Sequence, residues 1–221
     1  MLWVSILLVL VLNIVAVALL FKDVKKNAEL YPDWKEAKPP KSVWIYVAIV
    51  ASLSVAMTVF VSLFYEDNTW TFTLKRMLLL ALLGLIGYID FKTYRIPNIY
   101  ILAGLVTRVV FLVIELICRE PAVWYDMLMD VIVAVIILVI ALVCTIFVKN
   151  GIGFGDMKLM CIMALFLGRQ GIWGAMFLSL LVSFVISIYL LLSKKKNRKD
   201  AIPFGPAIVA GTYLSVFLTG M

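Results

Sequence analysis

Long apolar runs are the feature that most limits what this chain can fold into. A membrane-spanning helix needs about 20 mostly apolar residues, and the chain offers several runs of that size, separated by short polar or Gly- and Pro-containing stretches. Strands of a membrane barrel would instead alternate apolar and polar residues. The pattern predicts an all-α, polytopic membrane helical bundle with eight spans, at approximately 2–21, 43–65, 74–90, 97–117, 123–148, 156–168, 171–193 and 202–219.

The composition agrees with this fold class. Hydrophobic residues make up 65% of the chain and charged residues 15%, with a mean hydropathy of +1.11, far from the composition of a soluble domain. The sixth run is short enough to be a partial span. The polar loop at 22–42 is too short for a folded domain, so we expect a single membrane-embedded domain over 1–221, with anchor spans at 1–73 and a functional core at about 74–220.

The positions of lysine and arginine predict the orientation of the bundle, because short cytoplasmic loops retain positive charge. With eight spans, fifteen of these residues fall on one side and four on the other, with Arg108 inside a span. Both chain termini are therefore expected outside, with the basic loops in the cytoplasm of a cell-membrane protein. The fifteen are Lys22, Lys25, Lys26, Lys35, Lys38, Lys41, Lys92, Arg95, Lys149, Lys158, Lys194, Lys195, Lys196, Arg198 and Lys199, and the four are Lys75, Arg76, Arg119 and Arg169. Nucleic-acid binding is not expected, since the basic loops are short and lack interleaved aromatic residues.

Histidine and cysteine usage excludes several kinds of site. The chain has no histidine, which leaves no Ser-His-Asp or Cys-His catalytic arrangement. Cys118, Cys144 and Cys161 are isolated and form no CxxC pair, so a zinc site lacks ligands. We expect no metal and no cofactor, and we interpret the three cysteines as small packing residues.

Acidic residues inside the membrane are costly and tend to mark function. Of the thirteen acids, five lie in or at the ends of spans. Glu115, Asp126 and Asp130 fall near the side opposite the basic loops, where we expect structural or interfacial roles. Asp90 and Asp156 both fall at the predicted cytoplasmic edge, since Asp90 closes the third span and Asp156 opens the sixth.

Local sequence around these two aspartates favours a fixed backbone. Pro97 follows Asp90 and suits the first turn of the next helix, where its missing N–H would have no partner anyway. Gly151, Gly153 and Gly155 precede Asp156 and permit close backbone approaches. Lys158 either neutralises a nearby charge or marks the inner membrane interface.

Two facing carboxylates suit peptide hydrolysis of the aspartic-protease kind. One ionised acid takes a proton from water while its protonated partner polarises the scissile carbonyl, and crowding of like charges drives the two pKa values apart. A G-x-G-D sequence by itself is weak evidence, because an aspartate at a glycine-rich turn also caps helices. Both interpretations remain open at this level.

Three motifs in order resemble the type IV prepilin peptidase family: "YIDFKTYRIPN" at 88–98, "GFGDMKLM" at 153–160 and "IPFGPAIVAG" at 202–211. The resemblance implies a polytopic membrane protease that removes a basic leader from prepilin-like substrates at the cytoplasmic face. It places the catalytic aspartates on Asp90 and Asp156. The residues expected to support the site or bind substrate are Gly153, Gly155, Lys158, Pro97, Asn98, Pro203, Gly205 and Pro206.

One departure from the family qualifies the expected activity. Larger bacterial members carry an insertion with two CxxC pairs after the first span and also N-methylate the trimmed pilin, whereas the loop at 22–42 has no cysteine. The chain therefore resembles a peptidase-only member, and a bacterial source fits its length better than an archaeal one. Two alternatives remain: a presenilin- or signal-peptide-peptidase-like intramembrane protease, and a transporter that uses the two aspartates as a proton relay.

Overall fold

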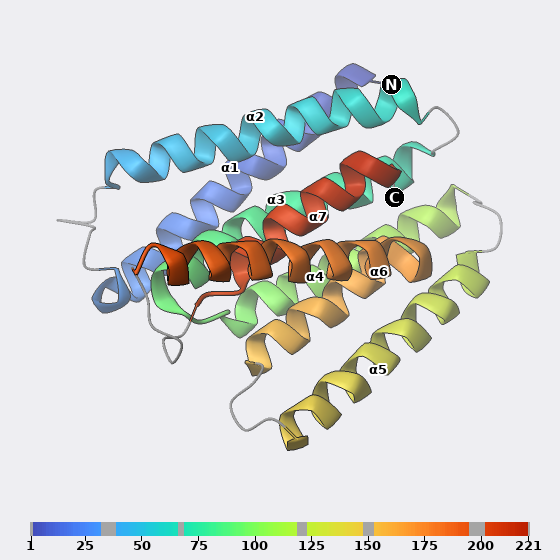
Figure 1. The fold of residues 1–221 in the computed structure, drawn as a ribbon. Coiled ribbons are helices and arrows are strands. Elements are labelled where there is room, and N and C mark those ends of the chain that lie inside the picture. The colour runs from blue at the N-terminus through green and yellow to red at the C-terminus, as the bar shows by residue number, and fades with distance from the viewer. Residues whose placement is uncertain are drawn as a thin grey trace.

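The structure is an all-α bundle in which each element follows one of the apolar runs (Figure 1). It is a computed structural model that describes residues 2–31, 39–65, 69–118, 123–147, 153–194 and 202–220. Within these ranges there are seven α-helices and a short 3₁₀ turn, η1, at Ala28–Leu30. The helices are α1 (Leu2–Lys26), α2 (Lys41–Phe64), α3 (Trp70–Thr93), α4 (Asn98–Ile117), α5 (Val123–Phe147), α6 (Phe154–Leu192) and α7 (Gly205–Thr219).

Helix α6 is broken at Gly168, which has φ 70° and ψ −179°. This conformation is open essentially only to glycine, and it divides α6 into limbs at 154–167 and 169–192. Figure 1 shows the chain doubling back at this point, so that the second limb returns toward the end from which the first one started. Counted as two limbs, α6 corresponds to the sixth and seventh predicted spans, and the described helices match all eight predicted runs.

Six of the described helices are long and apolar enough to cross a membrane, and α7 is a shorter apolar helix. The predicted polytopic helical bundle is therefore confirmed. The first limb of α6 has fourteen residues, which corresponds to about 21 Å of helix and is shorter than a hydrocarbon core of about 30 Å. The proposed division into anchor spans and core, and the orientation in the membrane, stay predictions.

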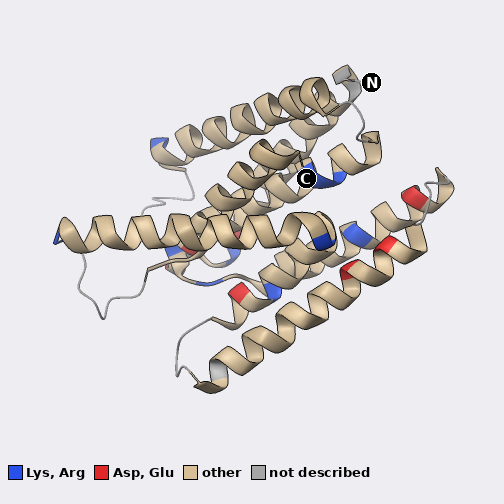
Figure 2. Ribbon diagram, turned by 45° about the vertical axis from the view of Figure 1, so that its right-hand side comes forward, with Lys and Arg blue, Asp and Glu red and all other residues tan. Residues whose placement is uncertain are grey.

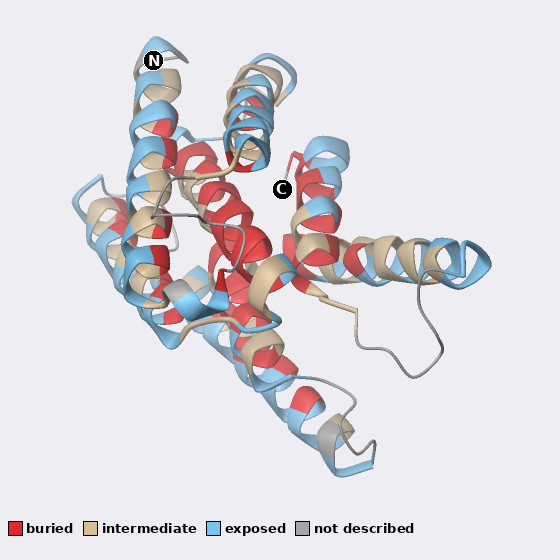
Figure 3. Cartoon of the chain, turned by 90° about the vertical axis from the view of Figure 1, so that its left-hand side faces the viewer, coloured by how far each residue is buried: buried red, intermediate tan, exposed pale blue. Residues whose placement is uncertain are grey.

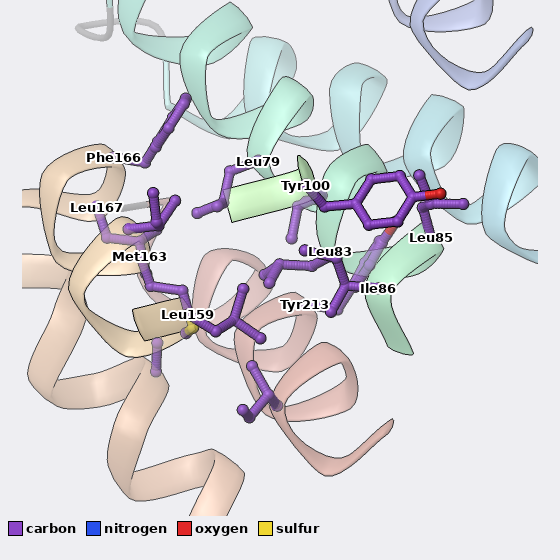
Figure 4. Close-up of a cluster of buried hydrophobic side chains, with 14 of the residues drawn as sticks. Leu79, Leu83, Leu85, Ile86, Tyr100, Leu159, Met163, Phe166, Leu167 and Tyr213 are labelled. Atoms are coloured by element: carbon purple, nitrogen blue, oxygen red, sulfur yellow. The ribbon is translucent and has the colours of Figure 1, made fainter. Parts of the chain in front are cut away.

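Helix α3 forms the centre of the bundle. It is buried along most of its length, whereas α1, α2 and α5 bury only narrow stripes (Figure 3). Leu79, Leu83 and Ile86 on α3 are fully buried, and they lie in one cluster with Leu159 and Met163 of the first α6 limb (Figure 4). The second α6 limb stands away from this centre (Figure 3).

Small residues allow α3 to approach its neighbours closely, as is common between membrane helices. A Cβ on Gly84 would lie 2.8 Å from Val50 of α2, and one on Gly87 would lie 2.5 Å from Val209 of α7. The Tyr46 hydroxyl of α2 also donates to the Gly84 carbonyl at 2.6 Å. Close backbone packing therefore fixes α3 against α2 and α7, and it positions the end of α3 beside the start of α7.

Charged residues gather at the two ends of the bundle and are sparse between them (Figure 2). The start of α1 and the end of α7 lie at the same end of the molecule (Figure 1). The end of α3 and the start of α6 lie at the opposite end, where Asp90 and Asp156 are found.

Candidate active site

Asp90 lies in the last turn of α3 and is only 5% exposed. Its Oδ2 accepts a hydrogen bond of 2.7 Å from the backbone N–H of Gly205. Gly205 is the first residue of α7, and N–H groups in the first turn of a helix have no partner within that helix. The start of α7 thus holds one oxygen of a buried carboxylate, in a position where a helix favours negative charge.

Asp156 lies in the first turn of α6 and is partly exposed. Its carboxylate is hydrogen-bonded to the backbone N–H of Gly153, and it lies close enough to Asp90 for the two charges to interact. No residue of the described ranges forms a salt bridge with either carboxylate. The structure therefore brings together two acids that are 66 positions apart in the sequence and gives them backbone N–H groups, rather than cations, as partners.

Direct contacts join the other segments of this end of the bundle. A Cβ on Gly155 would lie 3.0 Å from the Cβ of Ile96, so the start of α6 packs on the turn that follows α3. The Lys158 ammonium donates to the Asn98 side-chain oxygen at 3.0 Å. With the bond from Gly205 to Asp90, all three sequence motifs meet in one place.

The prolines lie at the helix starts of this site. Pro97 is the N-cap residue of α4 and has φ −66°, one position before the first-turn placement expected from the sequence. The helix begins one residue later than expected, at Asn98, and the Pro97 carbonyl accepts a hydrogen bond from the Tyr100 N–H, as an N-cap carbonyl does. Pro206 is the second residue of α7, and Pro203 is a half-buried residue of the segment that leads into it.

The contacts of Lys158 and Asp156 bear on two interpretations from the sequence, namely charge neutralisation by Lys158 and helix capping by Asp156. The exposed Lys158 lies at the helix start, as expected, but its described partner is the neutral side chain of Asn98 rather than a carboxylate. Asp156 occupies the third position of α6 and bonds back to the N-cap residue Gly153, which is the returning half of a capping box. Capping explains this one bond, but it gives no reason for Asp90 to lie nearby.

Sequence reasoning missed the contribution of Gly205 as a donor to Asp90. The motif at 202–211 was expected only to pack beside the site. The signal lay in the Gly-Pro pair, since proline favours the first turn of a helix, where backbone N–H groups have no partner within the helix. Among the described residues, no group of three or more His, Cys, Asp or Glu side chains is arranged to hold a metal ion.

Glu115 and Asp130 lie at the other end of the bundle and have basic partners there. Glu115 forms salt bridges with Lys75 at 2.9 Å and Arg108 at 3.0 Å, and Arg108 reaches Asp130 at 3.7 Å. These pairs agree with the structural role expected from the sequence. Asp126 is exposed on the first turn of α5.

The chain resembles known proteins in the segment that carries this site. The model of the type IV leader peptidase family matches residues 77–192, which is more than half of the chain. Among curated proteins, the chain is 32% identical over 68 residues to a prepilin leader peptidase/N-methyltransferase of Aeromonas salmonicida (strain A449), covering 31% of this chain and 23% of that relative. A protein of the same name from Xanthomonas campestris pv. campestris is 33% identical over 69 residues, covering 31% and 24%.

The matched segment spans about a quarter of the length of these curated relatives. No solved structure matches the chain significantly. The match to the family model includes both Asp90 and Asp156 and both limbs of α6. The chain is therefore a multi-pass membrane protein that belongs to the type IV leader peptidase family.

Proposed function

We propose that this protein is an aspartic endopeptidase that removes the basic leader from type IV prepilin-like substrates at the cytoplasmic face of the membrane. The observation that carries the proposal is the pairing of Asp90 with Asp156 at one end of the bundle, without a basic partner among the described residues. A carboxylate that serves only to hold helices together is expected to have a cation, as Glu115 does. A pair that shares negative charge suits proton transfer.

The reaction follows from the arrangement of the two acids. Like charges at close range favour one proton shared between them. The ionised carboxylate takes a proton from water, and the resulting oxygen nucleophile attacks the scissile carbonyl. The protonated partner hydrogen-bonds to the carbonyl oxygen and stabilises the charge that develops there. When the C–N bond breaks, a proton passes to the leaving amine, and the acids return to their starting state.

Backbone contacts keep the acids in position for this work. The Gly205 N–H fixes Asp90 from α7, while Gly153 fixes Asp156 from the α6 start. Asp156 is the more exposed of the two, which leaves one side of the pair open to water and to a peptide. Orientation of catalytic groups supplies a large part of the rate enhancement of an enzyme, so these backbone bonds are expected to matter for the reaction.

The proposed substrate is supported by the family and by the names of the curated relatives. The test is incubation of the purified protein in detergent with a purified prepilin, followed by mass spectrometry of the products. We expect one cut between the leader and the mature pilin. A cut inside the hydrophobic segment would favour an intramembrane protease, and proton flux in vesicles without any cut would favour a transporter.

The relatives' names also include N-methyltransferase activity, and we propose that this chain lacks it. The support is the loop at 22–42, which contains no cysteine. With S-adenosylmethionine supplied and this protein as the sole enzyme, the processed pilin should carry a free N-terminal amine. A mass increase of one methyl group on the pilin would refute the peptidase-only assignment.

The proposed orientation follows from the positive charge of the loops that flank the site end. A tag placed in the loop at 22–42 or at 194–200 should be protected from membrane-impermeant reagents in intact cells. A tag at 66–72 should react. The reverse pattern of labelling would move the aspartate pair to the outer face and exclude cleavage in the cytoplasm.

A further inference from the structure

A cavity of about 280 Å³ lies at the end of the bundle remote from the aspartate pair. Its polar walls come from the start of α3, the end of α4, the start of α5 and the break in α6. The charged lining residues are Lys75, Arg76, Arg108, Arg169, Glu115, Asp126 and Asp130. The proposed peptidase reaction uses none of them.

Most of the buried charges in this cavity balance one another. Lys75 and Arg108 share Glu115, and Arg108 also reaches Asp130. These four residues together carry no net charge. Two basic side chains, Arg76 and Arg169, then face one remaining acid, Asp126, so the lining has an excess of one positive charge.

Arg76 is the buried cation of this lining that forms no salt bridge within the described part of the chain. Arg76 is only 3% exposed. The Cζ atom of its guanidinium lies over the Phe72 ring, 3.2 Å from the ring centroid. One nitrogen, Nη2, donates to the Leu167 carbonyl at 3.3 Å. Among the described residues, the Nε and Nη1 atoms have no hydrogen-bond partner. A buried guanidinium with unsatisfied donors is costly, and an anion that accepts from Nη1 relieves part of that cost.

The chemistry of the free group indicates what kind of anion fits. In the planar guanidinium the free Nη1 lies beside Nη2 on the outer edge, and the donors along such an edge match two oxygens of a carboxylate or phosphate, while Nε–H points along a different edge. The lining acids already repel a negative ligand, so a group that can spread its charge over several oxygens and meet several donors is favoured. The cavity is formed at helix ends, which lie at the depth of lipid headgroups in a membrane.

We propose that this cavity binds a phosphate group, with Arg76 as the main donor and Arg169 at the mouth. The group belongs either to an anionic lipid headgroup or to a soluble phosphate. Arg169 lies on the second α6 limb, and its guanidinium is 5.7 Å from the Tyr125 ring of α5. A phosphate between Arg76 and Arg169 therefore joins α3 to the break in α6. The inference is independent of the proposed peptidase function.

The test measures thermal unfolding of the full-length protein in a neutral detergent, with added inorganic phosphate or with micelles containing phosphatidylglycerol. Phosphatidylcholine micelles and sodium chloride at equal ionic strength serve as controls. A ligand that binds the folded state raises the melting temperature with increasing concentration. Stabilisation by phosphatidylglycerol alone identifies a lipid site, whereas equal stabilisation by inorganic phosphate identifies a soluble anion.

Two variants distinguish binding from a general effect of charge. Arg76→Gln should weaken the apparent affinity for the anion at least tenfold, while the ligand-free melting temperature is unchanged or higher, because a buried unpaired charge is removed. Asp126→Asn removes the remaining repelling acid and should tighten binding severalfold. Lys41→Gln, which removes one positive charge far from the cavity, should leave the affinity unchanged.

Several outcomes would contradict phosphate binding in this cavity. Absence of stabilisation by both phosphate and phosphatidylglycerol in the wild type would exclude the site. Stabilisation that persists unchanged in Arg76→Gln would place the anion elsewhere. If Arg76→Gln fails to fold, Asp126→Asn still decides, because unchanged or weaker affinity in that variant contradicts binding in this cavity.

Discussion

The two ends of the bundle use acidic residues in opposite ways. At one end, Asp90 and Asp156 lie near each other and are held by backbone N–H groups. At the other end, Glu115 and Asp130 lie among lysine and arginine side chains that neutralise them. Under the proposed function, the partners of a buried acid indicate its role better than its burial does.

The energetic consequences of the two arrangements differ as well. An acid in a buried ion pair holds helices together, and removing it leaves a cation unpaired in a poorly solvated place. An acid that faces another acid gains little stability from its neighbour. Removal of its charge should therefore affect the reaction much more than the fold.

The largest expected effect comes from removing either acid of the pair. Asp90→Asn and Asp156→Asn should each lower the rate of prepilin cleavage by at least about 10³-fold, because an amide cannot accept a proton from water or hold the shared one. Both variants should insert, purify and melt like the wild type. The double variant should be no slower than either single one, since the two acids act as one unit.

Glu29→Gln is the matched control for these variants, because Glu29 is an exposed acid in the turn after α1, at the same end of the bundle. Its rate should equal that of the wild type. Cleavage within tenfold of the wild-type rate by a well-folded Asp90→Asn or Asp156→Asn would falsify the aspartate-pair mechanism.

The second prediction concerns stability at the other end. Glu115→Gln should lower the free energy of unfolding by about 3 kcal/mol, because it removes the acid that Lys75 and Arg108 share and leaves buried cations without a counter-charge. Thermal unfolding in detergent measures this change. A melting temperature for Glu115→Gln equal to that of Asp156→Asn would remove the distinction between the two ends.

The third prediction tests whether the start of α7 positions Asp90. A Cβ on Gly205 would lie 2.7 Å from Asp90 Oδ2 and 2.8 Å from Asp90 Cβ, so Gly205→Ala must displace the carboxylate. Misplacement of a catalytic group by about 1 Å costs roughly 10²-fold in rate. We expect a loss in kcat of that order, with the mutant still able to insert.

Gly174→Ala is the corresponding control, since a Cβ there meets only the Ser215 hydroxyl, at 3.1 Å. Its kcat should stay within twofold of the wild-type value. Similar losses in both glycine variants would mean that helix packing in general, rather than the position of Asp90, controls the rate.

The smallest effect is expected from the exposed pair beside the site. Lys158→Ala and Asn98→Ala should each lower the cleavage rate about threefold, and the double variant should show the same loss, because both remove one hydrogen bond. Lys22→Ala, at an exposed position near the end of α1, is the control for loss of charge. Multiplied losses in the double variant would show that the two side chains act separately.

The elements of the fold could be predicted because the apolar runs are separated by short polar or Gly- and Pro-containing stretches, and most of the runs have the length of a span. The break at Gly168 falls on the last residue of the sixth predicted run, next to the gap before the seventh. The turn geometry could not be predicted, since Gly168 is one of several glycines in this half of the chain. Its special backbone angles depend on how α6 folds back beside α5 and α7.

The aspartates of the candidate site could be identified from their motifs, but their partners could not. The bond between Gly205 and Asp90 joins positions that no local pattern connects. The cavity around Arg76 shows the same limit, because its cations come from three helices. A signal existed in the charge count, since the predicted topology puts Lys75, Arg76 and Arg169 on the side where positive charge is disfavoured, and these residues thus required an explanation.

The bond between Gly205 and Asp90 also sets an order for assembly during synthesis. The two residues are 115 positions apart, so α3 enters the membrane long before α7 has been translated. Until residue 205 emerges, Asp90 lacks the donor that fixes it, and a nascent or truncated chain has both acids but not this bond. Under the proposed function, we expect full activity only after the last helix has been inserted.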